Sequence, residues 1–383
     1  MRLAVTGLLT LAVAIGIGRF AFTPILPVMQ KDLGLSLRAA GLLASANYIG
    51  YFLGALSAIW LRLSPGTVVR GSVLAIVILT VAMGIAQGTA AWLILRGLAG
   101  VASAWALIFA SAWILQALAE RKRGALGGVV FGGVGAGIAL TGILCVGFLR
   151  LEWSAGQIWI AMGVVAMLPV YFIWSACAFA PSQRTAAAAS AARPSLRSGA
   201  NLRLIWSYGS FGFGYIIPAT FLPAMARQVI PDPAVFGWAW PIFGTAALLS
   251  VLLAGYLSSR YSYRAIWLAS QLVMAIGVAV PVAWNAIGGI VVSALCVGGT
   301  FVVATMAGVQ EGRRVAAGNA TSLIAAMTTA FAVGQILGPL VVSAVAEKTW
   351  GMSFSLLTAT FVLLAGAAAL LKSEKRDERK EKR

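Results

Sequence analysis

The chain has 383 residues, of which 61% are hydrophobic and only 10% are charged. Soluble globular proteins carry about 25% charged residues, so this composition excludes an ordinary soluble domain. The formal net charge is +18, but the basic residues lie in short segments between apolar runs, a pattern that indicates a membrane protein rather than nucleic-acid binding. The chain has no histidine, and its three cysteines lie far apart. We therefore expect no metal, no cofactor and no disulfide framework.

Long apolar segments recur from Leu3 to Leu371, and each can cross a hydrocarbon core of roughly 30 Å as a helix. The runs are continuous rather than alternating, which favours helices over a β-barrel. The first run is too long for a signal peptide, so we interpret it as a retained span. We predict twelve spans, at residues 3–29, 39–61, 67–87, 90–118, 124–149, 156–179, 203–226, 235–258, 264–284, 287–309, 315–345 and 351–371.

The first predicted span contains an unusual stretch, Gly16–Met29, with the sequence GIGRFAFTPILPVM. It holds Arg19 in otherwise apolar surroundings, and it holds Pro24 and Pro27, which remove backbone hydrogen bonds from a helix. A second copy follows 196 positions later, where Tyr215 replaces Arg19. The copies share glycine, leucine, proline and methionine positions: Gly16 and Gly212, Gly18 and Gly214, Leu26 and Leu222, Pro27 and Pro223, and Met29 and Met225. This repeat predicts two similar halves around one site.

The spans accordingly divide into two groups of six. We predict an all-α membrane protein with an N-terminal bundle at residues 1–179 and a C-terminal bundle at 202–371, pseudo-symmetric to each other. The segment between them, 180–201, is small, polar and basic, as a cytoplasmic linker is. The tail at 372–383 mixes both charges, which predicts a solvated or frayed helix end, with lipid-headgroup binding as the alternative.

The charges also predict the topology. Of the 28 Lys and Arg residues, 21 fall on the side of the linker and both chain ends, five fall on the opposite side, and Arg19 and Arg96 lie inside spans. Because basic residues favour the cytoplasmic side, we expect both termini there. All ten Asp and Glu residues are expected at span ends, in loops or in the tail. Without an intramembrane carboxylate, histidine or lysine, we expect neither an enzyme nor a dedicated proton carrier.

The two intramembrane arginines are the sharpest functional signal. Helical rise places Arg19 roughly 15 Å and Arg96 roughly 9 Å below the outer membrane end, which is compatible with one shared site. A charged residue in the bilayer normally faces a cavity or a partner. One interpretation is an anion clamp, because guanidinium groups match carboxylate and phosphate. The other is that each arginine ties helices together through backbone carbonyls or neighbouring polar side chains.

Further polar residues could complete this site. Asn47 and Tyr51 share a helix face by their spacing and could bind a substrate or tie two helices, while Tyr215 holds the repeat position of Arg19. We therefore predict one substrate-binding site formed by Arg19, Asn47, Tyr51, Arg96 and Tyr215. The glycine-rich fifth span, GALGGVVFGGVGAGIALTG, has no preceding strand and predicts close helix packing rather than a dinucleotide site.

Over essentially its whole length the chain resembles the major facilitator superfamily. The run RGLAG at Arg96–Gly100 resembles that family's fourth-span motif, and GYLSSRYSYR at Gly255–Arg264 resembles its loop motif, with Ser259 in place of the usual Asp. The stretches GIGRFAFTPILPVMQ and GLLASANYIGYFLGAL are similar to the bacterial YbfB/YjiJ-type subfamily. The resemblance implies a transporter of the bacterial inner membrane. In the resembled family the first, fourth, seventh and tenth spans line the cavity, which supports Arg19, Arg96 and Tyr215 as site residues.

We expect a secondary active or facilitative transporter of a small organic anion that works by alternating access. The alternative within transport is an efflux protein for sugar-like or apolar compounds, and the alternative outside transport is a receptor or lipid-handling scaffold. The expected partners are a small-molecule substrate and the lipid bilayer, with no nucleic acid, and the protein is expected to be a monomer.

Overall fold

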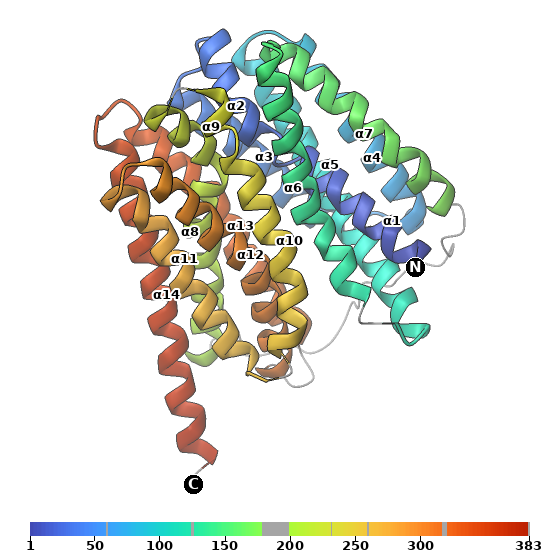
Figure 1. Cartoon of the computed structure of the whole chain (residues 1–383). Helices are drawn as coiled ribbons and strands as arrows, with labels where there is room; N and C mark the ends of the chain where they lie inside the picture. The colour runs from blue at the N-terminus through green and yellow to red at the C-terminus, as the bar shows by residue number, and fades with distance from the viewer. Residues whose placement is uncertain are drawn as a thin grey trace.

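A computed structural model describes residues 1–58, 60–123, 126–177, 199–230, 232–258, 260–315 and 320–381 (Figure 1). Every regular element in these ranges is helical, as the sequence predicts. The first part contains α1 (Arg2–Leu11), the π-helix η1 (Ala12–Ile17), α2 (Phe22–Asp32), α3 (Leu37–Ser57), α4 (Pro65–Ile85), α5 (Thr89–Glu120), α6 (Gly127–Arg150) and α7 (Ala155–Cys177). The second part contains α8 (Gly199–Val229), α9 (Pro233–Phe236), α10 (Ala239–Ser258), α11 (Tyr263–Ala283), α12 (Ile287–Val315), α13 (Ala320–Val345) and α14 (Gly351–Glu381).

Ten helical segments in the described residues are long and apolar enough to cross a membrane. The first of them, Arg2–Asp32, joins α1, η1 and α2. The predicted spans at 203–226 and 235–258 fall on α8 and α10, where a shorter apolar helix covers Ala239–Val251. The protein is therefore a multi-helix membrane protein.

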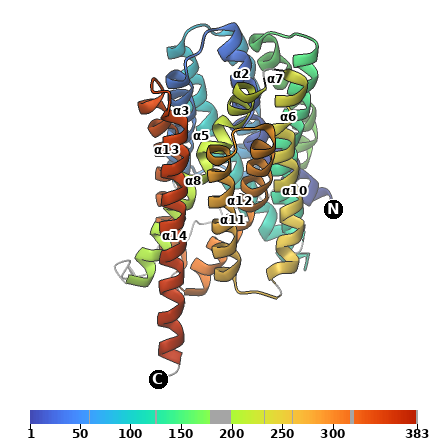
Figure 2. The same ribbon diagram turned by 60° about the vertical axis from the view of Figure 1, so that its left-hand side comes forward.

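Some predicted boundaries change. The predicted linker at 180–201 lies outside the described residues except for its last three, which belong to the first turn of α8. The predicted tail is helical up to Glu381, and α14 extends well beyond the neighbouring helices (Figure 2). The tenth predicted span ends at 309, but α12 continues to Val315 and includes Glu311.

Helices pack against one another both within each part of the chain and between the two parts. In the first part α3 packs on α5, and α4 on α5 and α7; in the second, α8 packs on α13 and α14, and α11 on α12 and α14. The most extensive pairings between the two parts are α2 with α8, α3 with α13, and α6 with α10. The glycines of the fifth predicted span make the last pairing close, as predicted, because Gly135 and Gly142 lie against the backbone of α10.

The repeated stretches meet each other directly. The Thr23 hydroxyl in α2 donates a hydrogen bond of 3.0 Å to the carbonyl of Ala219 in α8, and these residues are 196 positions apart. This separation equals the spacing of the sequence repeat. Equivalent points of the two copies therefore touch where α2 crosses α8, as expected when a pseudo-twofold axis passes through a contact between equivalent elements.

The contact between α3 and α5 depends on two glycines that allow backbone-to-backbone approach. A Cβ at Gly100 would lie 2.0 Å from the Asn47 carbonyl oxygen, and one at Gly50 would lie 1.9 Å from the Gly97 carbonyl oxygen. Since backbone cannot yield as a side chain can, any other residue at either position forces the helices apart.

We predict that Gly100→Ala lowers the thermal unfolding temperature of the purified protein, because overpacking costs about 1–3 kcal/mol. Gly71→Ala is the matched control, since a Cβ at Gly71 meets nothing within 4 Å. The fluorescence-monitored unfolding temperature in detergent measures both. Equal stability of the two variants would contradict this account of the α3–α5 contact.

Candidate functional site

The first span breaks at Arg19. The chain forms a π-helix over Ala12–Ile17 and then a turn, so that the Phe20 N–H donates to the Ile15 carbonyl at 3.0 Å, five residues back. Helix α2 starts only at Phe22, and the Thr23 N–H donates to Phe20 at 3.1 Å rather than to Arg19. Pro24 and Pro27 lie beyond the break, inside α2. The turn therefore leaves the carbonyl of Arg19 available to another partner, and such π-type interruptions often occur at functional sites.

Arg96 of α5 is the partner of the Arg19 carbonyl. It is 2% exposed, and its Nη2 donates to the Arg19 carbonyl at 2.9 Å while Nη1 donates to the Gly18 carbonyl at 3.3 Å. Its guanidinium also lies 5.0 Å from the ring centre of Phe22. The terminal nitrogens of Arg96 are thus engaged with backbone, which corresponds to the helix-tie interpretation.

Asn47 of α3 extends this tie. Its side chain is fully buried, and Nδ2 donates to the Arg96 carbonyl at 2.9 Å. Its Oδ1 is buried without a hydrogen-bond partner. Asn47 therefore joins α3 to α5 and presents one free neutral acceptor.

Arg19 itself is enclosed by aromatic rings. Its side chain is 5% exposed, and its guanidinium carbon lies 4.4 Å from the ring centre of Tyr51, 4.8 Å from that of Tyr48 and 5.4 Å from that of Phe20. The Nε and Nη2 atoms of Arg19 are buried and have no hydrogen-bond partner. These two atoms form one edge of the guanidinium plane, the edge that can hold both oxygens of a carboxylate.

In the part of the chain that the structure describes, no acidic side chain forms an ion pair with Arg19 or Arg96. Glu311 is one of two carboxylates within the candidate spans of the described residues, with Asp32 at the last position of the first span, and it lies in α12 beyond the predicted span end at residue 309. It is fully buried and pairs with Arg264 at 2.7 Å and Arg314 at 2.9 Å. It lies only roughly 6 Å from the end of α12 by helical rise. The sequence prediction missed this pair because it placed Arg264 and Glu311 outside or at the edges of the spans.

Tyr215 belongs to an aromatic cluster in the second part of the chain. Its ring stacks between Phe301, at 5.5 Å, and Phe331, at 5.7 Å, and its hydroxyl accepts a hydrogen bond from the Gln335 side chain. A continuous series of ring contacts links this cluster to the Arg19 region: Phe20 to Trp240, Trp240 to Phe243, and Phe243 to Phe301. The structure thus connects Tyr215 to Arg19 through intervening rings.

The predicted set of site residues leaves out two residues of this region. Tyr48 lies one turn before Tyr51 on α3, and its hydroxyl lies 3.0 Å from the hydroxyl of Thr220 in α8. Trp240 is fully buried, and its Nε1 has no hydrogen-bond partner. The spacing of the two tyrosines could have indicated Tyr48, whereas no local pattern places Trp240 beside Phe20. No group of three potential metal-ligating side chains occurs in the part of the chain that the structure describes.

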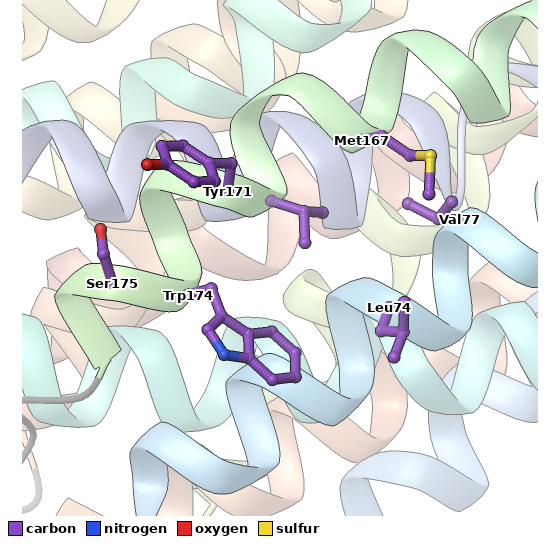
Figure 3. A pocket seen from close by; sticks show the side chains of 7 residues that line it. Leu74, Val77, Met167, Tyr171, Trp174 and Ser175 are labelled. Atoms are coloured by element: carbon purple, nitrogen blue, oxygen red, sulfur yellow. The ribbon is translucent and has the colours of Figure 1, made fainter.

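A pocket of about 340 Å³ lies elsewhere, between α4 and α7 (Figure 3). Leu74, Met167, Tyr171 and Trp174 line it, and Tyr171 is 76% exposed. Because its lining belongs to the outward surface of α7, this pocket is a feature of the lipid-facing side and is separate from the Arg19 site.

Comparisons with known proteins place this architecture. A crystal structure of a point mutant of the nucleoside transporter NupG matches with a TM-score of 0.69, covering 97% of this chain and 99% of that chain at 16% sequence identity. No curated protein matches the chain. The model of the family described as "Uncharacterised MFS-type transporter YbfB" matches residues 11–371. The chain therefore belongs to the YbfB-type transporter family of the major facilitator superfamily.

Proposed function

We propose that the chain transports a small organic anion across the bacterial inner membrane, with Arg19 as the residue that binds the anionic group. The free Nε–Nη2 edge of this buried arginine carries the proposal. An uncompensated buried charge is strongly unfavourable, so a site of this kind gains most from an anionic ligand. The planar edge matches a carboxylate in two parallel hydrogen bonds.

Neutral solutes fit the site less well. A sugar-like or apolar compound would leave the charge of Arg19 uncompensated, and so would a nucleoside, the class of solute for which the structural neighbour NupG is named. These compounds remain the alternative within transport, and a receptor or lipid-handling scaffold is the alternative outside it. The family membership favours transport.

The proposed mechanism is alternating access between two six-helix bundles, residues 1–179 and 202–371, joined by a linker at 180–201. Contacts between the parts support it, since the hydrogen bonds that cross between the described residues of the two parts involve α2 and α3 of the first part. They join Thr23 to Ala219, Tyr48 to Thr220, Ser45 to Ile336, Arg227 to Pro27, and Ser343 to Arg38, and Glu347 adds an ion pair with Arg38. Rocking of one bundle against the other would break these contacts and expose Arg19 to the side of the membrane where the contacts lie.

Counterflow in proteoliposomes tests the proposal. Vesicles preloaded with unlabelled compound are given a trace of the labelled compound, across a panel of organic anions, nucleosides and neutral sugars. We expect accumulation of an organic anion only. Movement of nucleosides or sugars without any anion would assign the alternative substrate class, and a receptor or scaffold would move nothing.

We also predict that both termini face the cytoplasm, because 21 basic residues fall on their side and five on the other. A reporter that fluoresces only in the cytoplasm, fused after Arg383, should be fluorescent. The matched control is a reporter that is active only in the periplasm, fused at the same residue, which should be silent. The reverse pair of signals would invert the topology.

We predict further that proton coupling uses no dedicated protein carrier in the substrate path. Arginine stays charged in proteins and cannot cycle protons, and Glu311 is held by two arginines near the end of α12. Proton flux driven by a permanently charged, non-titrating substrate in proteoliposomes should therefore be absent. Stoichiometric proton movement that disappears in Glu311→Gln or Glu120→Gln would contradict this prediction.

A further inference from the structure

We infer that the substrate of the Arg19 site is a carboxylate with an apolar body and no ammonium group, so that the site excludes amino acids. This inference rests on the proposed function and narrows its substrate class. It depends on which hydrogen-bonding atoms remain free around Arg19, which charges are already compensated, and what the surrounding walls are made of.

The free polar atoms near Arg19 are mainly donors. Besides Nε and Nη2 of Arg19, the buried Nε1 of Trp240 has no partner, and Trp240 contacts Phe20 beside the guanidinium. The hydroxyl groups of Tyr48 and Tyr215 are engaged with Thr220 and Gln335. The site therefore offers hydrogen bonds to an acceptor such as a carboxylate.

Among the described residues, no carboxylate pairs with Arg19 or Arg96, so none is placed to receive an ammonium group beside them. Asn47 Oδ1 is a free acceptor, but it is neutral, and the Asn47 side chain is bonded to the backbone of the cationic Arg96. Arg96 donates to the backbone carbonyl of Arg19, so its guanidinium lies close to the residue that carries the other positive charge. A cation placed near these two residues would be repelled by both guanidinium groups. Glu311, which lies within α12, is already paired with Arg264 and Arg314.

The aromatic rings around Arg19 indicate the chemistry of the rest of the substrate, beyond its carboxylate. The rings of Phe20, Tyr48 and Tyr51 surround the guanidinium, and those of Trp240 and Phe243 continue from Phe20. Such surfaces favour apolar or aromatic groups and would leave hydroxylated bodies without hydrogen-bond partners. A substrate with its carboxylate at the Nε–Nη2 edge of Arg19 and an apolar body against these rings matches both the free donors and the aromatic surfaces.

Matched pairs of compounds test this inference in proteoliposomes. The first pair is 3-phenylpropanoate and phenylalanine, and the second is 4-methylpentanoate and leucine; within each pair only the α-ammonium group differs. Each compound competes for uptake of whichever labelled anion the counterflow panel identifies, and a further pair is built on the body of that anion. Binding of the same compounds, followed by the unfolding temperature in detergent, provides a second measurement that does not require turnover.

We expect the acid of each pair that binds to compete at least about tenfold more strongly than its amino acid, because like charges a few ångströms apart repel by more than a tenfold affinity change requires. Arg19→Gln should reduce this preference, whereas the exposed Arg150→Gln should leave it unchanged. Equal or stronger competition by the amino acid would overturn the inference while leaving anion transport intact. Failure of every anion to bind or move would overturn the proposed function and the inference with it.

Discussion

Arg19→Lys should reduce anion transport by roughly 10- to 100-fold. Lysine keeps the positive charge but has no planar edge with two parallel donors, so the carboxylate loses one charge-assisted hydrogen bond. Hydrogen bonds to charged groups contribute about 1.5–3 kcal/mol, and about 1.4 kcal/mol corresponds to a factor of ten. Initial uptake rates in proteoliposomes, normalised to the amount of inserted protein, measure the change.

The control for this variant is Arg150→Lys, which makes the same chemical change at an exposed residue at the end of α6. It should transport as the wild type does. Arg19→Lys must also elute as the same monodisperse species in size-exclusion chromatography, so that a loss of transport reports on the site. Normal transport by a folded Arg19→Lys variant would show that Arg19 does not bind the carboxylate through two parallel hydrogen bonds.

Arg96→Met should give the largest loss of stability among single substitutions near the site. The change leaves the Gly18 and Arg19 carbonyls without the donors that Arg96 supplies. A buried polar group that loses its partner costs about 1–3 kcal/mol, so we expect about 2–6 kcal/mol in total. The measurement is the denaturant or thermal unfolding curve of the detergent-solubilised protein.

Arg62→Met is the matched control, because Arg62 is exposed between α3 and α4. We expect little change in its unfolding curve. Any Arg96→Met protein that does fold should also transport poorly, because the turn that carries Arg19 has lost its anchor. A variant that unfolds like the wild type would contradict the role of Arg96 in holding the break of the first span.

The sequence predicted the helical membrane architecture because hydrocarbon thickness imposes long apolar runs that are visible in any single chain. The 196-residue repeat predicted two similar halves around one site, and in the structure Thr23 of one copy bonds to Ala219 of the other. Boundaries were less predictable. Arg313 and Arg314 mark the last turn of α12, but the apolar run stops before them, so Glu311 was placed at the membrane edge although it lies within the helix, paired with Arg264.

The site was predictable only in part. Intramembrane charge singles out Arg19 and Arg96, but their different hydrogen bonding depends on the π-helical turn, which frees one carbonyl for Arg96. The prolines suggested a kink, and the break lies in the turn before Pro24, where proline has no N–H to donate to the Phe20 carbonyl. Trp240 approaches Phe20 from a distant helix, and only tertiary structure reveals such a contact.

The most direct test of anion binding by Nε and Nη2 of Arg19 is an experimental structure of the protein with a transported anion bound. The account predicts that two carboxylate oxygens lie about 2.7–2.9 Å from Nε and Nη2 of Arg19, while Arg96 continues to donate to the Gly18 and Arg19 carbonyls. A bound anion that leaves this edge of Arg19 empty, or that is held by Arg96 instead, would contradict the account.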